Sequence, residues 1–462
     1  MPLMHDDASS DPDPEEFSSR IFGAGPPDPR AREAGLELLP FRGVRFVPEV
    51  VGDLATVTAP PYDLIDDSEA DGLRASDSHN IVRLILPHRT PGGAPADPYR
   101  QADAVLRSWL TEGALTVDPE PALYVYEVRG GDTLQRGLIG AVGLRPESAG
   151  VVLPHENVFP GPVRDRLALM SATRANLEPI FLLYDGDAGG VADGDGTAGA
   201  AARVVEETAA GEDPVVEVTA GGLAYRLWRV ANPAEHARVA ADLRGRRALI
   251  ADGHHRYATY RALQARHRAA GAGAGPWDHG LALLVDSARY PARLGAIHRV
   301  LPDLPPEEAV DRAKEVFRVT EAPADPDAAR RALAGATGPA FLLGGGTGPR
   351  YLLTEPDPVR LEQALPPGRS ARWRRLDTAV LDHLLISGVW GVAESEHTVH
   401  VVHHDPAAAF ERARRTGGTA VILNPLRTED VLAVAEGGER VPRKSTSFGP
   451  KPRTGLVFRL FD

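Results

Sequence analysis

The sequence predicts a mixed α/β (α+β) protein with more than one domain. Strand-like apolar runs alternate with amphipathic helical patterns along most of the 462 residues, and no fixed-period repeat is visible. Hydrophobic residues make up 43% and charged residues 25%, an ordinary globular balance. A chain of this length can form two or three domains, each with a buried core.

The first 35 residues are expected to form a disordered tail. They lack apolar periodicity and are rich in Asp, Pro and Ser. The acidic, polar start does not resemble a secretory signal, and no apolar run reaches the roughly 18 residues of a membrane span. The chain contains no cysteine, which excludes disulfides, thiol nucleophiles and cysteine-ligated metals. We therefore expect a cytoplasmic protein with no membrane partner.

An N-terminal α+β domain is predicted over residues 36–300. It opens with the short apolar stretch Gly43–Val51 and the stiff segment Ala59–Ile65, followed by the strand-like run Asn80–Leu86. Further apolar runs predict strands at Leu123–Val128, Leu138–Leu144, Pro179–Tyr184, Val215–Thr219, Ala224–Val230, Arg247–Ala251 and Gly280–Asp286. Helical spacing predicts helices at Tyr99–Gly113, Arg164–Thr173 and His254–Ala269, and the Gly- and Asp-rich segment Asp185–Ala200 reads as a surface loop.

A C-terminal α/β domain is predicted over residues 301–462, with the boundary near Leu301–Pro306. Helices are expected at Pro306–Phe317, Asp327–Ala334, Leu376–Ile386, Asp405–Thr416 and Glu429–Glu436. Strands are expected at Ala340–Leu343, Tyr351–Thr354, Thr398–Val402, Thr419–Leu423 and Leu456–Leu460.

The basic residues of the chain are almost all arginine, and acidic residues outnumber basic ones. The net charge is −13, which disfavours a broad nucleic-acid footprint. Of the 51 basic residues only three are lysine: Lys314, Lys444 and Lys451. The last two stand at the ends of one octapeptide, KSTSFGPK, and a compact ammonium is not interchangeable with a guanidinium.

The strongest local motif is Asp252-Gly253-His254-His255-Arg256. An apolar strand is predicted to end at Asp252, turn at Gly253 and enter a helix. The start of such a helix presents backbone N–H groups to an anion, and Arg256 adds a fork suited to phosphate oxygens. Asp252 could cap the helix, bind a metal or act as a base. The structural alternative is a capped turn with surface histidines, and adjacent histidines lack the i, i+4 spacing of a helical zinc site.

A second motif is the loop that starts at His155-Glu156 and leads into a helix with Arg164 and Arg166. Glu156 is a candidate general base or Mg²⁺ ligand, and the arginines are candidate anion ligands. The alternative is a solvated helix start, because charged loops are common.

The third motif is the lysine-flanked octapeptide. Lys444 and Lys451 with the hydroxyls of Ser445 and Thr446 suit phosphate or carboxylate recognition. The segment is not a P-loop, since it lacks the glycine spacing and the strand-to-helix setting, so a polar turn is the alternative. Motifs of serine hydrolases, Rossmann oxidoreductases, zincins and protein kinases are absent from the sequence.

Together these segments resemble the bacterial and archaeal family called domain of unknown function 1015. The likeness extends from about Phe41 to Phe458. It rests on Pro61-Tyr62-Asp63, Asn80–Leu84, His155-Glu156, Asp165–Leu167, Ala251–Tyr257, His298-Arg299, Pro442–Thr446, Pro450-Lys451 and Gly455-Leu456. Thr259 and Gly449 depart from the family pattern.

The Gly-His-His-Arg turn also looks like the phosphate-binding turn of the ParB/sulfiredoxin-like superfamily. That resemblance implies a ParB/sulfiredoxin-like mixed sheet for the N-terminal domain, with Gly253, His255 and Arg256 holding a nucleotide phosphate. Sulfiredoxin has its cysteine where this chain has His254, so its chemistry is excluded. Some members of the superfamily phosphorylate free serine.

The leading hypothesis is a phosphotransferase that uses ATP or another nucleotide, with Mg²⁺, to phosphorylate a small hydroxylated metabolite such as free serine. Its proposed catalytic residues are Glu156, Asp252, His155 and His254, and its proposed phosphate or substrate ligands are Gly253, His255, Arg256, Arg166, Lys444, Ser445, Thr446 and Lys451. The alternatives are a non-catalytic nucleotide- or metabolite-binding regulator and a phosphate-ester hydrolase. A ParB-like DNA-binding role is disfavoured by the net charge. The sequence does not decide whether the protein is an enzyme.

Overall fold

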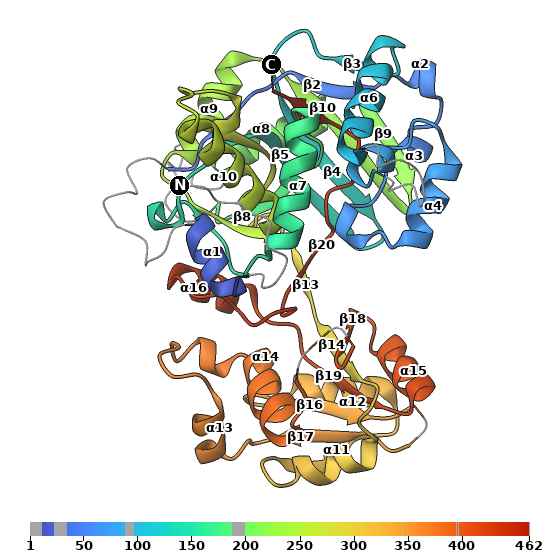
Figure 1. Ribbon diagram of the computed structural model, residues 1–462, viewed down its shortest axis with the longest axis vertical. Helices are drawn as coiled ribbons and strands as arrows, with labels where there is room; N and C mark the ends of the chain where they lie inside the picture. Colours follow the sequence, from blue (N-terminus) through green and yellow to red (C-terminus); the bar gives the residue numbers. More distant parts are fainter. Residues whose placement is uncertain are drawn as a thin grey trace. The chain divides into compact units, whose positions relative to one another are not determined.

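The computed structural model describes residues 12–22, 35–87, 97–186, 199–346, 348–393, 395 and 397–461. The chain divides into two compact units (Figure 1). Unit 1 comprises Met1–Ala292 together with Pro450–Asp462, and unit 2 comprises Arg293–Gly449. Helices and mixed parallel and antiparallel strands confirm the predicted mixed α/β class. The division differs from the sequence-based boundaries in two respects, because unit 2 begins at Arg293 rather than near Leu301–Pro306 and the last residues belong with unit 1.

Unit 1 is built around a nine-stranded sheet with the order β6-β11-β8-β12-β5-β4-β10-β9, and β1 pairs with β5. The pairs β8–β12 and β6–β11 are parallel and the others are antiparallel. The central strands are buried on both faces, which explains their continuous apolar runs. The strands are β1 (Leu38–Leu39), β4 (Leu123–Gly130), β5 (Thr133–Gly143), β6 (Val152–Leu153), β8 (Ile180–Tyr184), β9 (Val216–Ala220), β10 (Leu223–Val230), β11 (Ala248–Asp252) and β12 (His279–Asp286).

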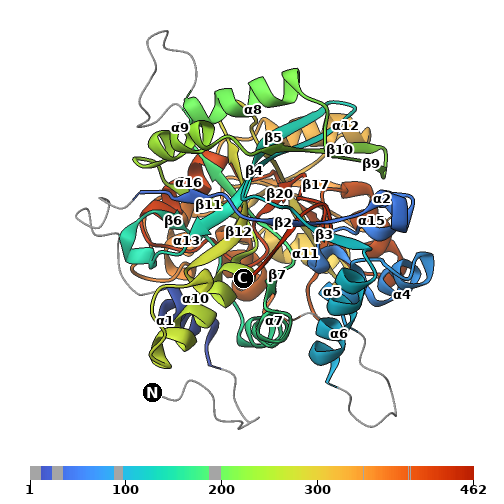
Figure 2. The ribbon, with the colours of Figure 1, turned by 90° about the horizontal axis from the view of Figure 1, so that it is seen from above.

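Helices cover both faces of this sheet. Figure 2 shows α8 and α9 on one face and α7 and α10 on the other. Asp, Asn and Pro residues at helix starts supply side-chain caps or a preset backbone angle, as at Asp66, Asp97 and Asn232. The helices of unit 1 are α1 (Pro14–Phe22), α2 (Pro48–Val51), α3 (Leu54–Val57), η2 (Tyr62–Leu64), α4 (Asp67–Ser76), α5 (Val82–Ile85), α6 (Pro98–Thr111), η3 (Glu147–Ala149), α7 (Pro160–Thr173), α8 (Ala200–Gly211), α9 (Pro233–Leu243), α10 (His254–Ala269) and η4 (Pro276–Asp278).

A second, four-stranded sheet of unit 1 holds the end of the chain. Strand β21 (Phe458–Leu460) lies between β2 (Gly43–Phe46) and β7 (Ala175–Asn176), and β3 (Leu115–Val117) pairs with β2. All three pairings are antiparallel. Because β21 is paired on both sides, the segment that begins at Pro450 is anchored within unit 1.

Two local predictions are wrong. The expected strand Asn80–Leu86 contains helix α5, because the Asn80 side chain accepts a hydrogen bond from the Val82 N–H (2.9 Å) and starts a helical turn. The expected disordered tail contains helix α1, whose Phe22 is 1% exposed and stacks on Tyr257. Burial of that ring offsets the entropy of ordering the helix. Residues 1–11 and 23–34 of the tail, and 187–198 of the predicted loop, lie outside the described residues.

Unit 2 contains a six-stranded, fully antiparallel sheet with the order β15-β17-β16-β19-β14-β18. A two-stranded ribbon, β13–β20, pairs the segments through which the chain enters and leaves the unit. The strands are β13 (Arg293–Gly295), β14 (Ile297–Leu301), β15 (Arg318–Glu321), β16 (Phe341–Gly344), β17 (Tyr351–Thr354), β18 (His400–His403), β19 (Thr419–Ile422) and β20 (Ser447–Gly449). The helices are α11 (Pro306–Ala313), α12 (Pro326–Ala334), α13 (Pro358–Ala364), η5 (Trp373–Arg375), α14 (Asp377–Val380), the π-helical η6 (Leu381–Val389), α15 (Pro406–Thr416) and α16 (Thr428–Glu436).

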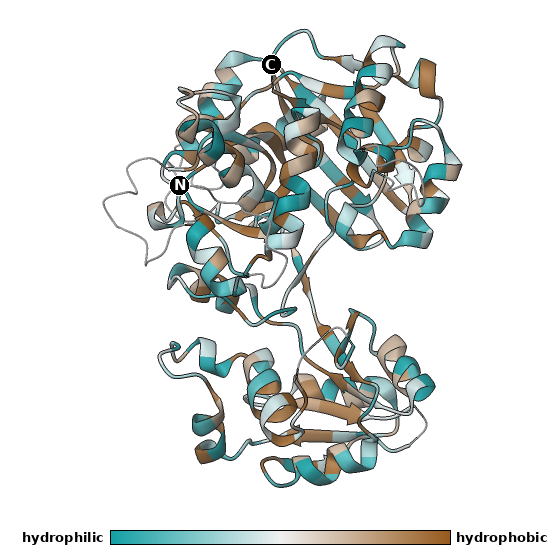
Figure 3. Cartoon of the chain, viewed as in Figure 1, coloured by the Kyte–Doolittle hydropathy of each residue, from teal (hydrophilic) through white to brown (hydrophobic). Residues whose placement is uncertain are grey.

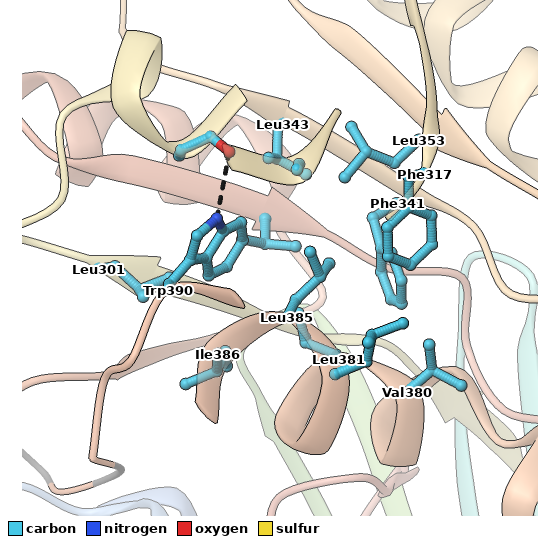
Figure 4. Close-up of a cluster of buried hydrophobic side chains, with 14 of the residues drawn as sticks. Leu301, Phe317, Phe341, Leu343, Leu353, Val380, Leu381, Leu385, Ile386 and Trp390 are labelled. Atoms are coloured by element: carbon cyan, nitrogen blue, oxygen red, sulfur yellow. Dashed lines mark hydrogen bonds between the residues drawn. The ribbon is translucent and has the colours of Figure 1, made fainter. Parts of the chain in front are cut away.

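The strands of unit 2 send alternate residues into two cores, one on each face of the sheet. Leu301, Leu343 and Val421 pack with the α11 and η6 side, where the Trp390 indole N–H donates to the Ala309 carbonyl (3.1 Å; Figure 4). The neighbouring strand residues pack on the α12 and α15 side. Figure 3 shows these strands as mostly hydrophobic. Within the described residues, no helix is both long and apolar enough to cross a bilayer.

Candidate functional site

The predicted strand–turn–helix is present in unit 1. Strand β11 ends at Asp252, Gly253 adopts φ 94°, and α10 starts at His254. A Cβ at Gly253 would lie 2.8 Å from Ile180 Cγ2, so both the backbone angle and the space demand glycine. The turn therefore holds Asp252 and the first residues of α10 in fixed positions.

A lysine bridges two carboxylates at this turn. Lys451 Nζ lies 2.5 Å from Asp252 Oδ1 and 2.5 Å from Asp63 Oδ2. The Lys451 side chain is 15% exposed, Asp252 10% and Asp63 35%. Although burial alone would lower it, the two carboxylates hold the pKa of Lys451 above its usual value. Burial opposes the shift of Asp63 too, but Lys451 and Arg256 keep the pKa of that carboxyl below its usual range.

Arg256 lies behind this bridge and is buried. One terminal nitrogen donates to Asp252 Oδ2 (2.5 Å) and the other to the Pro179 carbonyl (2.6 Å). Burial opposes the protonated form, yet Asp252 and Glu178 hold the pKa of Arg256 above its usual value. Both oxygens of Asp252 are thus paired with cations, and both terminal nitrogens of Arg256 are engaged. Arg256 acts on the site through its charge and through Asp252.

The ring of a tyrosine beside this cluster lies close to two guanidiniums. The carbon at the centre of the Arg166 guanidinium is 4.5 Å from the centre of the Tyr62 ring, and that of Arg256 is 5.9 Å away. Burial raises the pKa of Tyr62 to about 12, so the phenol stays protonated at neutral pH. The Arg166 guanidinium also donates to Asp165 and to the Ile85 carbonyl (2.6 Å), which fixes its plane.

Glu178 is the last member of the cluster. Its Oε1 accepts hydrogen bonds from the Tyr62 N–H (3.0 Å) and the Thr454 hydroxyl (3.1 Å). The residue is 5% exposed, and burial raises the pKa of Glu178 despite the nearby Arg256. A carboxyl with these contacts ties the segment around Tyr62 to the one around Thr454. We name the set Asp63, Asp252, Lys451, Arg256, Tyr62, Arg166 and Glu178 the lysine-bridged centre.

The histidines of the first two motifs join those motifs to each other. His254 Nε2 accepts from the His155 N–H (3.2 Å), and His255 Nε2 accepts from the Phe159 N–H (3.1 Å). The rings of His155 and His254 meet edge to face, with centroids 4.5 Å apart. Glu156 is 31% exposed, and its carboxylate lies 4.0 Å from His155 Nε2 and 3.9 Å from His254 Nδ1. The two motifs therefore share one region of unit 1.

The first part of the lysine-flanked octapeptide lies in the other unit. Lys444, Ser445 and Thr446 belong to unit 2, whereas Lys451 belongs to unit 1. The Ser445 hydroxyl donates to the Pro442 carbonyl (2.6 Å) and is buried. Lys444 lines a cavity of unit 2 with His400. The structure thus brings Lys451, Arg256 and Asp252 together in unit 1. Lys444, Ser445 and Thr446 lie in unit 2 and contact other residues there.

The centre does not fit a magnesium ion at Asp252 as it stands. The Lys451 ammonium and the Arg256 guanidinium occupy the two oxygens that a cation would need. No group of three or more His, Asp or Glu side chains placed to hold a metal occurs within the described residues.

The sequence reasoning missed three members of the centre. Tyr62 and Asp63 stand in the Pro-Tyr-Asp segment, which offers a phenol and a carboxylate but in most proteins is only a turn. Glu178 had no local signal at all, since it precedes an ordinary buried strand. Their roles arise only from the charges they meet in the fold.

A family model described as "Protein of unknown function (DUF1015)" matches residues 38–379. The chain belongs to the DUF1015 family. The match spans most of unit 1 and the first part of unit 2, and its description gives no activity. No curated protein matches this DUF1015 chain.

Solved structures similar to the DUF1015 chain are distant. A free serine kinase in complex with AMP has a TM-score of 0.32 at 16% identity, covering 65% of this chain and 84% of that one. SbnI with a C-terminal truncation, from Staphylococcus aureus, has 0.33 at 12% identity, with 67% and 82% covered. A conserved hypothetical protein from Pyrococcus furiosus has 0.31 at 14% identity, with 67% and 90% covered. Similarity at this level is too weak to assign a function.

Proposed function

We propose that this DUF1015 protein is a nucleotide-dependent phosphotransferase whose active site is the lysine-bridged centre. The observation that carries the proposal is the Lys451 ammonium held 2.5 Å from both Asp63 and Asp252, beside the N-terminus of α10. Phosphoryl transfer needs positioned positive charge and a base near the acceptor hydroxyl more than covalent help from the protein. This centre offers both within a few ångströms.

Asp63 is the base in this proposal. It is the more exposed of the two carboxylates, and its lowered pKa keeps it ionised at neutral pH. The acceptor oxygen would attack the terminal phosphorus of the nucleotide, the bond from that phosphorus to the bridging oxygen would break, and the hydroxyl proton would pass to Asp63. Glu156, partly exposed and near two histidines, is the alternative base.

The cations neutralise charge and hold the geometry. Lys451 would meet the transferred phosphoryl oxygens while Asp252 keeps its ammonium in place. Gly253 and the first turn of α10 would approach the remaining phosphates with the positive end of the helix. His254 and His255 hold the Glu156 loop through its backbone N–H groups. Arg256 and Arg166 supply fixed positive charge around Tyr62.

The test is an assay of the purified full chain. The protein is incubated with ADP, ATP or CTP in magnesium-containing buffer and with serine, threonine, glycerol or inositol, and products are followed by ³¹P NMR. We expect a phosphorylated acceptor, with free serine the first to examine. Asp63→Asn and Lys451→Met should lower kcat by about 10³-fold, because each removes a group needed in the transition state. Lys444→Met is the matched control and should retain activity.

Absence of any nucleotide-dependent product across this panel overturns the phosphotransferase proposal. A second candidate is a regulator that binds nucleotide without turnover, which the full pairing of both Asp252 oxygens favours. It predicts a nucleotide-induced rise in Tm that Lys451→Met abolishes, with no product. Release of phosphate into water without an acceptor would instead indicate a hydrolase.

A further inference from the structure

Unit 2 contains a cavity that the proposed function does not use. Its volume is about 390 Å³, within the range of small-molecule sites. Leu333 and Ile422 form part of an apolar wall, and His298 lies among the polar lining residues. Every residue lining the cavity belongs to unit 2. The cavity therefore lies within one compact unit, and its lining of apolar and polar residues suits an amphipathic ligand.

His298 presents a buried donor at this cavity. The residue is 2% exposed, and its Nδ1 accepts a hydrogen bond from the Leu423 N–H (3.3 Å). The proton of the neutral ring is therefore on Nε2. Burial, followed by the charges of His404 and Arg299, lowers the pKa of His298 to about 4, so the ring is neutral at pH 7. Nε2 has no hydrogen-bond partner among the described residues, which is costly for a buried N–H.

His404 is held beside it in a strained conformation. Its φ is 62°, a left-handed angle that is unfavourable for a residue with a side chain. Its Nε2 lies 3.0 Å from the Ser447 hydroxyl. A Cβ at Gly295 would lie 1.7 Å from His404 Nδ1, so only glycine leaves room for this ring. The left-handed φ, the Ser447 contact and the space left by Gly295 thus hold the His404 ring at the cavity.

Two guanidiniums of α12 also line the cavity. The side chain of Arg330 is 59% exposed and that of Arg331 73% exposed. Within the part of the chain that the structure describes, each pairs with a surface carboxylate: Asp327 at 3.1 Å from Arg330, and Asp325 at 3.8 Å from Arg331. Exposed pairs of this kind contribute little, so both guanidiniums are available to a ligand carboxylate. Among the described residues, no Asp or Glu lines the cavity.

We propose that this cavity, named here the histidine pocket, binds a small organic carboxylate with an apolar body and a second oxygen. The carboxylate would pair with Arg330 and Arg331, and the body would pack on Leu333 and Ile422. The second oxygen, a carbonyl in the simplest case, accepts a hydrogen bond from the His298 Nε2–H. A branched 2-oxo acid has these features, and the pocket would give unit 2 a ligand site of its own.

The experiment titrates the full chain with four probes by isothermal calorimetry at pH 7: 4-methyl-2-oxopentanoate, isovalerate, acetate and inorganic phosphate. The oxo acid should bind most tightly, because it alone combines the apolar body with the carbonyl oxygen. Isovalerate should bind about tenfold more weakly, since it lacks that acceptor. Acetate and phosphate should show no heat of binding at millimolar concentration.

Three variants assign the binding to this pocket. Arg330→Gln combined with Arg331→Gln should weaken the oxo acid at least tenfold, whereas Arg318→Gln combined with Arg360→Gln, on exposed positions of the same unit, should not. His298→Asn keeps an acceptor for the Leu423 N–H and removes Nε2, so it should abolish the preference for the oxo acid over isovalerate. Ala334→Trp fills the exposed rim and should block binding without touching the core.

Loss of the preference for the oxo acid in His298→Asn counts only if the far-UV spectrum and Tm of this variant match those of the parent. The two surface double variants keep the test decisive if His298→Asn does not fold. Phosphate binding as tightly as the carboxylates, no binding of any probe, or equal losses in both double variants would each overturn the proposal. None of these outcomes depends on phosphotransferase activity.

Discussion

Lys444 and Lys451 come from one octapeptide yet sit in opposite environments. Lys451 is largely buried between two carboxylates, which raise its pKa against the effect of burial. Lys444 is exposed, adopts φ 54° and lines a cavity of unit 2 whose other charged members are the cations Arg412 and Arg443. Among the described residues no carboxylate pairs with Lys444. The same residue type is thus an internal counter-ion at one end and a solvated charge at the other.

The difference lies in what each lysine meets rather than in its neighbours along the chain. Strand β21 anchors Pro450–Asp462 in unit 1, where Asp63 lies 388 residues before Lys451 in sequence. A buried charge of this kind is strongly coupled to its partners, whereas an exposed charge is screened by water. Substitutions at the two ends should therefore have very different effects.

The largest effect is expected from Lys451→Met. It leaves Asp63 and Asp252 facing each other without the ammonium, and should destabilise unit 1 by about 3 kcal/mol. Lys444→Met should change the stability of unit 2 by less than about 0.5 kcal/mol, since surface substitutions rarely do more. Urea unfolding with hydrogen exchange of peptides from β11 and β19 measures the two units separately. Equal losses of unfolding free energy in the two variants would contradict the inference that the two lysines lie in different environments.

Acid should weaken unit 2 through His298. The folded pKa of His298 is about 4, below its ordinary 6.5, so the unfolded chain binds a proton first as the pH falls. The stability from His298 is present above pH 6.5 and is lost between pH 6.5 and 4, by at most about 3 kcal/mol at roughly 1.4 kcal/mol per pKa unit. Asp63 has a lowered pKa too, but its contribution is lost only below about pH 4, where a free Asp titrates.

The measurement is unfolding of each unit by urea at pH 7 and pH 4.5. Protection of β14 and β19 should fall at the lower pH in the parent and much less in His298→Asn. The groups facing His298 are His404, Arg299, Asp405 and His403, and none of them is altered in this variant. If the loss of protection between pH 7 and pH 4.5 is the same in His298→Asn as in the parent, a group other than His298 causes that loss.

The turn before α10 should be less tolerant than a turn of unit 2. Gly253→Ala combines an unfavourable φ of 94° with a contact of 2.8 Å to Ile180, and should cost about 2 kcal/mol. Gly417→Ala has φ 71° with nothing within 4 Å of the new methyl, and should cost about 1 kcal/mol. Gly253→Ala should also weaken any nucleotide-dependent rise in Tm. A larger loss for Gly417→Ala in chemical unfolding would contradict this account of the turn.

The smallest expected effect is a gain. Lys444→Gly removes the strain of a left-handed φ from a residue with a side chain, partly offset by the greater freedom of glycine in the unfolded chain. The net stabilisation should be about 0.5 kcal/mol, detected as a small rise in the Tm of unit 2. A clear loss of stability would show that the Lys444 side chain makes contacts that its exposed position does not suggest.

Local patterns predicted much of the fold correctly. The strand ending at Asp252 and the helix starting at His254 follow from an apolar run, a glycine and helical spacing, all within about 20 residues. Asn80–Leu86 was misread because its apolar residues suit either a strand or a short helix, and the side chain of Asn80 decided between them. The helix in Pro14–Phe22 was missed because its stability depends on the distant Tyr257.

By itself the sequence determined the mixed α/β class, the strand–turn–helix motif and membership of the DUF1015 family, because each of these depends on patterns of residues that are close together along the chain. Only the tertiary structure decided that Lys451 lies in unit 1 and contacts Asp63 and Asp252, whereas Lys444, Ser445 and Thr446 lie in unit 2. The same holds for the buried Glu178, whose contacts come from Tyr62 and Thr454. Pairing between residues hundreds of positions apart depends on strand order and burial, and neither propensity nor spacing along the chain encodes those distances.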